Sequence, residues 1–318
     1  MTMHDPIRSP DKPSATPSLI ERAADMYDFR KGLNQPGPQL PDAPAAKTPA
    51  PAAPAAAPVA ARPAAPVRPR AAFTLPVAAI DRDQMRERAF IVPDGPVTSI
   101  SEEFRIIKRR LLASIQAEAN AGLGPAAQRI LICSAQPNEG KTYSAINLAL
   151  SIATEQDHDV LLVDADFAKP SILSSLGIEG QRGLMDALAD PDVAVEDCII
   201  PTDIRGLSVL PAGRQTNTDS EYLASARTLE VLARLTEGHP GRIVIFDSPP
   251  LLAASPAATL AQHVGHALLV VRADVTSERA LKDALGLISD CNQIQLLLNG
   301  VKFSPSGRSF GSYYGYGE

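Results

Sequence analysis

The sequence predicts an α/β fold in which helices cover both faces of a doubly wound, mainly parallel sheet. Three features of the 318 residues support this prediction: apolar runs of strand length alternate with helical stretches, a glycine-containing loop follows the first run, and two later runs end in aspartate. The strand-like runs are 130–133, 160–163, 207–210, 243–246, 267–271 and 294–298. Buried strands that alternate with helices are typical of right-handed crossovers between parallel strands. We expect one globular domain over residues 97–303.

The residues before this domain divide into an arm and a linker. From residue 36 onward, prolines are interspersed mostly with alanine. This composition cannot bury a core and favours polyproline II, so we predict a Pro/Ala-rich linker over residues 36–96. Residues 1–35 are predicted to form a disordered arm with one short amphipathic helix, which begins at a capping box of Ser18 and Glu21. Two interpretations stay open: a marginal helix on its own, or a helix that folds in the groove of a partner.

Composition and charge exclude several kinds of partner. With 30 basic and 36 acidic residues the net charge is −6, so no basic field draws the chain to nucleic acid, and we predict no nucleic-acid partner. The cysteines Cys133, Cys198 and Cys291 lack the spacing of a zinc site or a disulfide framework. No apolar run reaches about 18 residues, and the N-terminus lacks the pattern of a signal peptide. We expect a cytoplasmic protein without a membrane span, which reaches a membrane only through a partner.

The loop after the first predicted strand carries the strongest motif. Residues 134–142 read Ser-Ala-Gln-Pro-Asn-Glu-Gly-Lys-Thr and match the pattern G-x-x-x-x-G-K-[ST], with Ala135 in place of the first glycine. Consecutive N–H groups of such a loop form a nest for an anion, the lysine contacts the β- and γ-phosphates, and the threonine hydroxyl binds Mg²⁺. We therefore predict a P-loop NTPase fold that binds ATP and Mg²⁺. The candidate nucleotide-binding residues are Ala135, Gln136, Pro137, Asn138, Glu139, Gly140, Lys141, Thr142 and Tyr143.

Three aspartates stand at the carboxyl ends of two other predicted strands. Asp164 and Asp166 follow the run 160–163, and Asp247 follows the run 243–246. Because the carboxyl ends of parallel strands face the ligand crevice, these carboxylates can converge on a magnesium nucleotide. The alternative is that an individual aspartate only caps the helix that follows it. We predict as catalytic residues Lys141, Asp164, Asp166 and Asp247, and as metal ligands Thr142, Asp166 and Asp247.

These motifs resemble those of the bacterial tyrosine autokinases of exopolysaccharide and capsule export, which are P-loop ATPases. The similarity covers residues 98–318 and rests on the phosphate loop, the motifs at Asp164 and Asp247, and a tyrosine-rich C-terminal segment. The segment that starts at Ser18 is similar to the subgroup encoded with exosortase (PEP-CTERM) loci. The resemblance implies a protein-tyrosine kinase in which Asp166 and Asp247 position the metal, and Asp164 accepts the proton of the incoming tyrosine hydroxyl.

The resemblance also implies a substrate and an assembly. Residues 304–318 are predicted to form a disordered tail whose tyrosines are phosphorylated by a neighbouring subunit, namely Tyr313, Tyr314 and Tyr316. The family forms a ring through an E-x-x-R-x-x-R helix, and the corresponding candidates are Glu102, Arg105, Lys108 and, as a substitute, Arg109. Lysine cannot make the forked contact of a guanidinium, and a solvated charged face is the alternative interpretation. The implied activator is a separate inner-membrane regulator of polysaccharide chain length.

Other interpretations of the same motifs stay open. A positioning ATPase of the ParA/MinD type has a lysine directly after the first glycine of its loop, where this chain has Gln136. A non-catalytic nucleotide-binding adaptor is the second alternative, because Ala135 departs from the loop pattern and Ala168 replaces an arginine common in the family. By analogy with related ATPases, Asn299 is a candidate adenine-binding residue, although a turn before Gly300 also explains an asparagine there.

Overall fold

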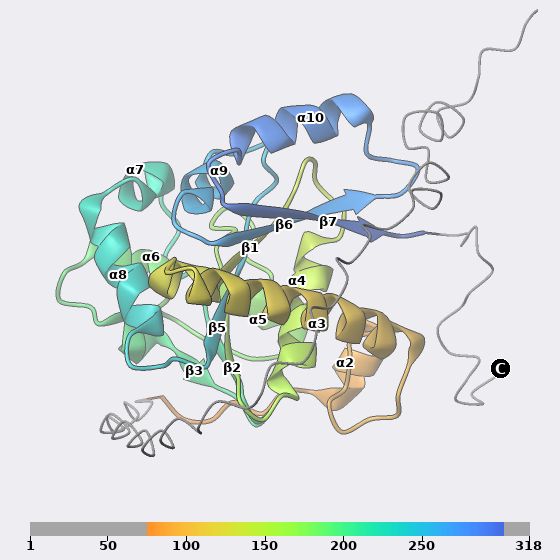
Figure 1. The fold of residues 1–318 in the computed structure, drawn as a ribbon. Coiled ribbons are helices and arrows are strands. Elements are labelled where there is room, and N and C mark those ends of the chain that lie inside the picture. Colours follow the sequence, from red (N-terminus) through yellow and green to blue (C-terminus); the bar gives the residue numbers. More distant parts are fainter. Residues whose placement is uncertain (1–74, 302–318) are drawn as a thin grey trace, which may run out of the picture. The chain divides into compact units, whose positions relative to one another are not determined.

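The computed structural model describes residues 75–301, and the predicted arm and tyrosine-rich tail lie outside these residues. In the described part, a seven-stranded sheet has the order β3-β4-β2-β5-β1-β6-β7 (Figure 1). The strands are β1 (Arg129–Ser134), β2 (Asp159–Asp164), β3 (Ile200–Pro201), β4 (Leu207–Leu210), β5 (Arg242–Asp247), β6 (His266–Arg272) and β7 (Gln293–Asn299). The pair β3–β4 is antiparallel, and the other neighbouring strands of this sheet pair in parallel. The predicted α/β fold with a mainly parallel sheet is confirmed.

Helices cover both faces of this sheet (Figure 1). They are α2 (Arg82–Glu87), α3 (Ser99–Asn120), α4 (Lys141–Ala153), α5 (Ile172–Leu176), α6 (Leu184–Ala189), α7 (Asp219–Leu223), α8 (Ala226–Thr236), α9 (Pro256–Ala261) and α10 (Glu278–Leu287), with short 3₁₀ turns at Gly124–Gln128 and Val195–Cys198. One hydrophobic cluster lies between the sheet and α6 to α10, and a second lies between the sheet and α2 to α5. The sheet is therefore buried on two sides, as a doubly wound fold requires.

Alternate residues of the central strand β1 contribute to the two clusters. Ile130 and Ile132 belong to the cluster beneath α2 to α5, whereas Leu131 and Cys133 belong to the cluster beneath α6 to α10. All four side chains are fully buried, and side chains along a strand alternate between faces. Burial of each large aliphatic side chain contributes about 1.5–3 kcal/mol. The strand that leads into the phosphate loop is therefore firmly anchored in the core.

Residues 75–96 differ from the prediction, which assigned them to the linker. The amide of Ala78 donates to the carbonyl oxygen of Pro201 at 2.8 Å, so this segment joins the edge of the sheet beside β3. The helix α2 follows, and its Met85 is completely buried among α4 and α5 residues of the second cluster. The predicted linker boundary is wrong, because the dense proline and alanine run ends at Pro69 and a six-residue helix is too short to reveal a helical period.

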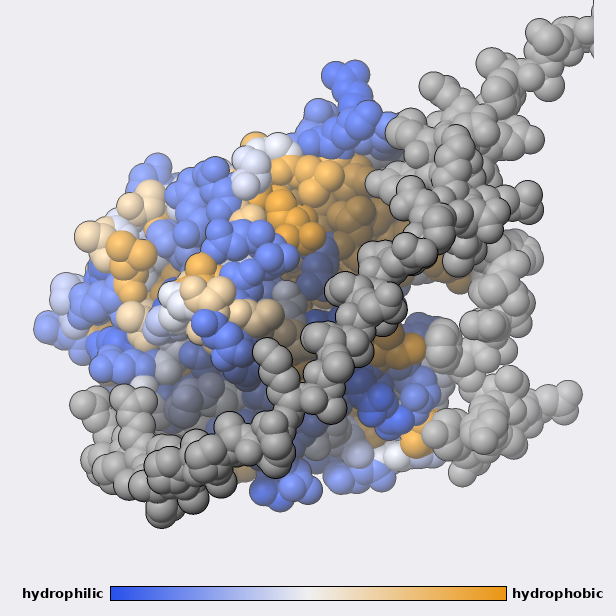
Figure 2. Space-filling model, in the orientation of Figure 1, coloured by the Kyte–Doolittle hydropathy of each residue, from blue (hydrophilic) through white to orange (hydrophobic). Residues whose placement is uncertain are grey.

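The opposite edge of the sheet is only partly covered. On the outer strand β7, Leu296 and Leu298 are 56% and 58% exposed, on the face that α10 covers in part. Apolar surface is visible beside α10 in the space-filling view (Figure 2). Within residues 75–301, none of the helices combines the length and the hydrophobicity needed to cross a membrane.

Candidate nucleotide site

The predicted phosphate loop connects β1 to α4 at the carboxyl edge of the sheet. Gly140 stands at the N-cap of α4 with φ of 97°, a left-handed conformation that glycine adopts without strain. Asn138 is also left-handed, with φ of 62°, and Ala135 is almost completely buried. No side chain of the described residues caps the amino end of α4, so the first amides of this helix can bind an anion.

The structure brings the loop together with the ends of β2 and β5. Asp164 and Asp247 are direct partners in the parallel pairing of these strands, so their carboxyl ends lie side by side. The Nζ atom of Lys141 lies 3.6 Å from Oδ2 of Asp166. Thr142 and Lys141 both act on the carboxyl group of Asp247 and favour its ionised form. The predicted catalytic lysine, threonine and aspartates therefore form one cluster.

Asp247 is the aspartate of this cluster whose negative charge is least stabilised by hydrogen bonds. Its side chain is fully buried, and neither carboxylate oxygen has a hydrogen-bond partner within the described residues. Burial raises its pKa to about 7, an effect that outweighs the opposing effects of the Thr142 hydroxyl and the Lys141 ammonium. A buried carboxylate without a partner is costly unless a cation neutralises it. This residue is therefore suited to bind a metal ion.

The donor set fits Mg²⁺ better than a metal held by protein ligands alone. Among residues 75–301, no group of three or more histidine, cysteine, aspartate or glutamate side chains could hold a metal ion. Mg²⁺ usually binds one or two carboxylates together with water and substrate phosphates. Asp247, Asp166 and the Thr142 hydroxyl supply two carboxylates and one hydroxyl beside the phosphate loop.

Asp164 has a different environment from the other two aspartates. Its Oδ2 accepts hydrogen bonds from the amides of Ser171 at 2.8 Å and Ile172 at 3.0 Å, and its Oδ1 accepts one from the amide of Asp166 at 3.2 Å. Burial raises its pKa to about 6, although these hydrogen bonds oppose the shift. The carboxylate therefore caps the amino end of α5, which is the alternative that the sequence left open, and its catalytic role stays a prediction.

The side chains of two predicted nucleotide-binding residues contact the protein itself. The hydroxyl of Tyr143 donates to the carbonyl oxygen of Ala89 at 2.8 Å, and its ring lies 5.7 Å from that of Phe90. Glu139 is 2% exposed, and its carboxylate accepts hydrogen bonds from within the protein. Tyr143 thus holds the segment that precedes α3, and Glu139 stabilises the loop from inside.

Asn299 contacts the phosphate loop. Its Nδ2 atom donates to the carbonyl oxygen of Glu139 at 2.9 Å, and its predicted role in binding adenine stays a prediction. Sequence analysis missed two further loop contacts: Arg272, the last residue of β6, and Thr276, which follows this strand. Their position follows from the sheet order: β6 pairs in parallel with β1 and β7 pairs in parallel with β6, so the carboxyl ends of all three strands reach the same edge.

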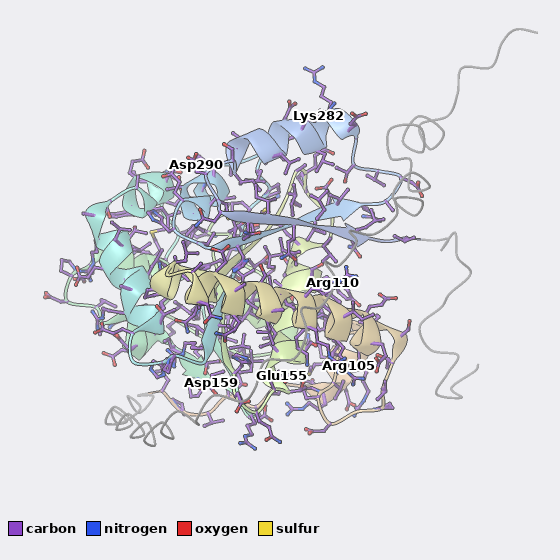
Figure 3. The ribbon with its side chains drawn as sticks, viewed as in Figure 1. Arg105, Arg110, Glu155, Asp159, Lys282 and Asp290 are labelled. Carbon is purple, nitrogen blue, oxygen red and sulfur yellow. The ribbon has the colours of Figure 1, made fainter. Side chains whose placement is uncertain are left out.

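The predicted ring residues lie on α3, and one of them, Lys108, is buried. Lys108 is 4% exposed; its ammonium donates to the carbonyl oxygen of Ser151 at 2.9 Å and pairs with Glu155 at 2.6 Å. Lys108 is therefore buried and paired within its own chain, and its predicted role in a subunit contact stays a prediction. Glu102 and Arg105 form an ion pair with each other and are only partly buried. Arg109 is exposed, and Arg105 projects from α3 in Figure 3.

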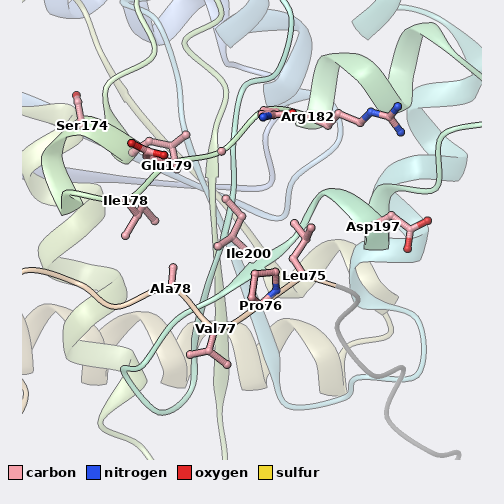
Figure 4. Close-up of a pocket in the computed structure, with 13 residues that line it drawn as sticks. Leu75, Pro76, Val77, Ala78, Ser174, Ile178, Glu179, Arg182, Asp197 and Ile200 are labelled. Atoms are coloured by element: carbon pink, nitrogen blue, oxygen red, sulfur yellow. The ribbon is translucent and has the colours of Figure 1, made fainter.

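A separate groove lies away from the phosphate loop. It has a volume of about 920 Å³ and is bordered by residues 75–78, the α5 region and residues 178–182 (Figure 4). Its lining is mainly apolar, with Glu179, Arg182 and Asp197 as charged members. None of the predicted site residues lines this groove.

Comparison with known proteins identifies the family. No family model matches the chain. Tyrosine-protein kinase YwqD of Bacillus subtilis (strain 168) is 28% identical over 239 residues, which cover 74% of this chain and 94% of YwqD. Tyrosine-protein kinase wzc of Salmonella typhimurium (strain LT2) is 28% identical over 235 residues, which cover 73% of this chain. The chain spans only 31% of the length of that Salmonella relative.

A solved structure agrees with these relatives. The kinase domain of VpsO is 32% identical to this chain, with a TM-score of 0.50, and the match covers 61% of this chain and 98% of that domain. Sequence and fold thus point to the same group of proteins over the part of the chain that carries the phosphate loop. The chain belongs to the family of bacterial tyrosine-protein kinases.

Proposed function

We propose that the chain is an ATP- and Mg²⁺-dependent protein-tyrosine kinase that phosphorylates its own tail at Tyr313, Tyr314 and Tyr316. The observation that carries this proposal is the buried, unpartnered carboxylate of Asp247 beside a phosphate loop. Phosphoryl transfer requires mainly alignment and neutralisation of charge, and this cluster offers both. The names of the relatives support tyrosine as the acceptor.

Each residue of the cluster has a separate task in this proposal. The loop amides near Gly140 bind phosphate oxygens, and Lys141, held beside Asp166, neutralises their charge. Thr142, Asp166 and Asp247 would hold Mg²⁺. Bound ATP with Mg²⁺ supplies the phosphoryl group.

The acceptor hydroxyl needs a base. The phenol of tyrosine has an ordinary pKa of about 10 and is a weak nucleophile at neutral pH, so a nearby carboxylate assists the transfer. Asp164 is the proposed proton acceptor. Its pKa, raised to about 6, makes its carboxylate a stronger base than an ordinary aspartate.

The proposal extends to assembly and regulation. We propose a homo-oligomeric ring in which one subunit phosphorylates the tail of the next, and in which α3 contributes Glu102, Arg105 and Arg109. A separate inner-membrane regulator of polysaccharide chain length activates the ring and brings this cytoplasmic protein to the membrane. The output is control of exopolysaccharide polymerisation or export. The assignment to the exosortase-associated subgroup rests on residues 18–22, which lie outside the described residues, and stays a prediction.

Intact-mass analysis tests the kinase proposal. Wild type incubated with Mg²⁺ and ATP is expected to gain mass in steps of one phosphate, because the tail offers three tyrosines. Lys141→Met removes the ammonium that neutralises phosphate charge, and a triple Tyr→Phe tail variant removes the acceptors; both are expected to show no such steps. Phosphate steps that persist in Lys141→Met would exclude this site as their source. Intact nucleotide binding without any phosphate gain in wild type would favour the non-catalytic adaptor or a positioning ATPase.

A further inference from the structure

The phosphate loop is held by side chains at the carboxyl ends of the strands β6 and β7, on what we call its outer side. The Nη1 atom of Arg272 donates to the carbonyl oxygen of Asn138 at 2.7 Å. The Nδ2 atom of Asn299 donates to the next carbonyl oxygen, that of Glu139, at 2.9 Å. Two consecutive carbonyls of the loop are therefore bound by side chains that lie more than 130 residues away in the sequence.

The Glu139 side chain connects these contacts from within the loop. Its Oε2 accepts a hydrogen bond from the amide of Gln136 at 2.8 Å, and its Oε1 accepts one from the hydroxyl of Thr276. The same Thr276 oxygen accepts a hydrogen bond from the amide of Arg272 at 2.9 Å. The loop, the end of β6 and the end of β7 thus form one continuous hydrogen-bond network. We call Arg272, Thr276 and Asn299 the loop clamp.

The loop clamp sets the direction of two amides of the phosphate loop, because the C=O and N–H groups of one peptide unit are rigidly connected. The structure has no cis peptide bond among the described residues, and in a trans peptide unit the C=O and N–H groups point in opposite directions. The carbonyl of Asn138 shares its unit with the amide of Glu139, and the carbonyl of Glu139 shares its unit with the amide of Gly140. Binding both carbonyls on the outer side therefore directs both amides to the inner side, where such a loop binds phosphate.

We propose that Asn299 and Arg272 are positioning residues that hold the phosphate loop in its anion-binding conformation. The inference rests on the nucleotide binding proposed above. The contact is close: a Cβ atom on Gly140 would lie 2.1 Å from Nδ2 of Asn299. Without the clamp, the two carbonyls lose their partners and the amides lose their fixed direction. The affinity for every ligand that binds through its phosphates is therefore lowered.

Equilibrium binding of two ligands distinguishes a clamp from a base-reading residue. The ligands are ATP and inorganic tripolyphosphate, which carries phosphates without a base, and the variants are Asn299→Ala and Arg272→Gln. Loss of one such hydrogen bond is expected to lower the affinity for both ligands by a similar factor of about tenfold. Gln295→Ala, on the same strand but without a contact to the loop, is the matched control and is expected to bind like wild type. Arg272 is exposed, so its variant folds even if Asn299→Ala does not.

The possible outcomes separate the inference from the proposed function. Affinities within twofold of wild type for both variants would overturn the inference. A loss confined to ATP in Asn299→Ala would also overturn it, because that result is expected of an adenine-reading residue. A wild-type chain that binds neither ligand would overturn the proposed function itself, and the inference with it. Melting temperatures without ligand show whether a weakened variant has kept its fold.

Discussion

Asp247→Asn is expected to lower the rate of Mg²⁺-dependent tyrosine phosphorylation by a hundredfold or more while stabilising the nucleotide-free domain. The carboxylate is fully buried and has no hydrogen-bond partner in the described residues, so its charge is costly in the absence of a cation. Asparagine has a similar shape and no charge, which removes this cost. The same change removes a metal ligand, which is why stability and activity are expected to move in opposite directions.

The same carboxylate makes stability depend on pH. Its pKa of about 7 in the folded domain exceeds the ordinary value of 3.8, so between these values the folded domain binds a proton that the unfolded chain has released. The free energy of unfolding therefore falls as pH rises from about 4 to 7, by up to about 4 kcal/mol. Asp164, whose pKa is raised to about 6, acts in the same direction. Asp247→Asn should remove most of this slope and leave the part due to Asp164.

Urea denaturation at pH 5 and pH 8 without nucleotide measures both effects. At pH 8 the Asp247→Asn domain is expected to be up to about 4 kcal/mol more stable than wild type, and at pH 5 this difference should shrink to about 1–2 kcal/mol. Asp290→Asn is the matched control, because it makes the same chemical change at an exposed position. A variant that is less stable than wild type at pH 8 would contradict the proposed cost of the buried charge.

Gly140→Ala is expected to weaken nucleotide binding by about a hundredfold. Gly140 has φ of 97°, which strains any residue with a Cβ atom, and the added Cβ would lie 2.1 Å from Nδ2 of Asn299. The chain can relieve this contact only by moving the loop or the clamp, and either movement misdirects the loop amides. Binding of ATP with Mg²⁺, measured by titration calorimetry, tests the expectation.

Gly286→Ala is the matched control for that experiment. Gly286 lies in α10, and a Cβ atom added there would meet no other atom within 4 Å. Alanine in a helix is about 0.5–1 kcal/mol more favourable than glycine, so this variant should be slightly more stable and bind ATP as wild type does. Equal ATP affinity in Gly140→Ala and Gly286→Ala would mean that the geometry at Gly140 is not needed for binding.

The fold and the centre of the site could be predicted from the sequence because their signals are local. Strands buried on both faces carry apolar residues in succession, as at 130–133 in β1, so they appear as continuous runs. The phosphate loop and the aspartates at Asp164 and Asp247 follow such strands directly, and parallel strands end at one edge of the sheet. The cluster of Lys141, Thr142 and the aspartates is a consequence of these two facts.

The residues that the sequence misplaced depend on long-range contacts. Arg272 and Thr276 belong to no motif, and only the pairing of β1 with β6 brings them to the loop. The burial of Lys108 could have been predicted from helical spacing. Phe104, Lys108 and Leu111 lie on one stripe of α3, and all three are buried. The prediction instead followed the match to the E-x-x-R-x-x-R pattern, which treats Lys108 as an exposed charged residue.

The central claim is that ATP with Mg²⁺ binds at the loop around Gly140 through Lys141 and Asp247. Calorimetric titration of ATP into wild type, Lys141→Met and Asp247→Asn, each with and without Mg²⁺, tests this claim most directly. One ATP is expected to bind per wild-type chain, more tightly with Mg²⁺ than without it; Asp247→Asn should lose the effect of Mg²⁺, and Lys141→Met should bind weakly in both conditions. Wild-type affinity and an unchanged effect of Mg²⁺ in both variants would contradict the account.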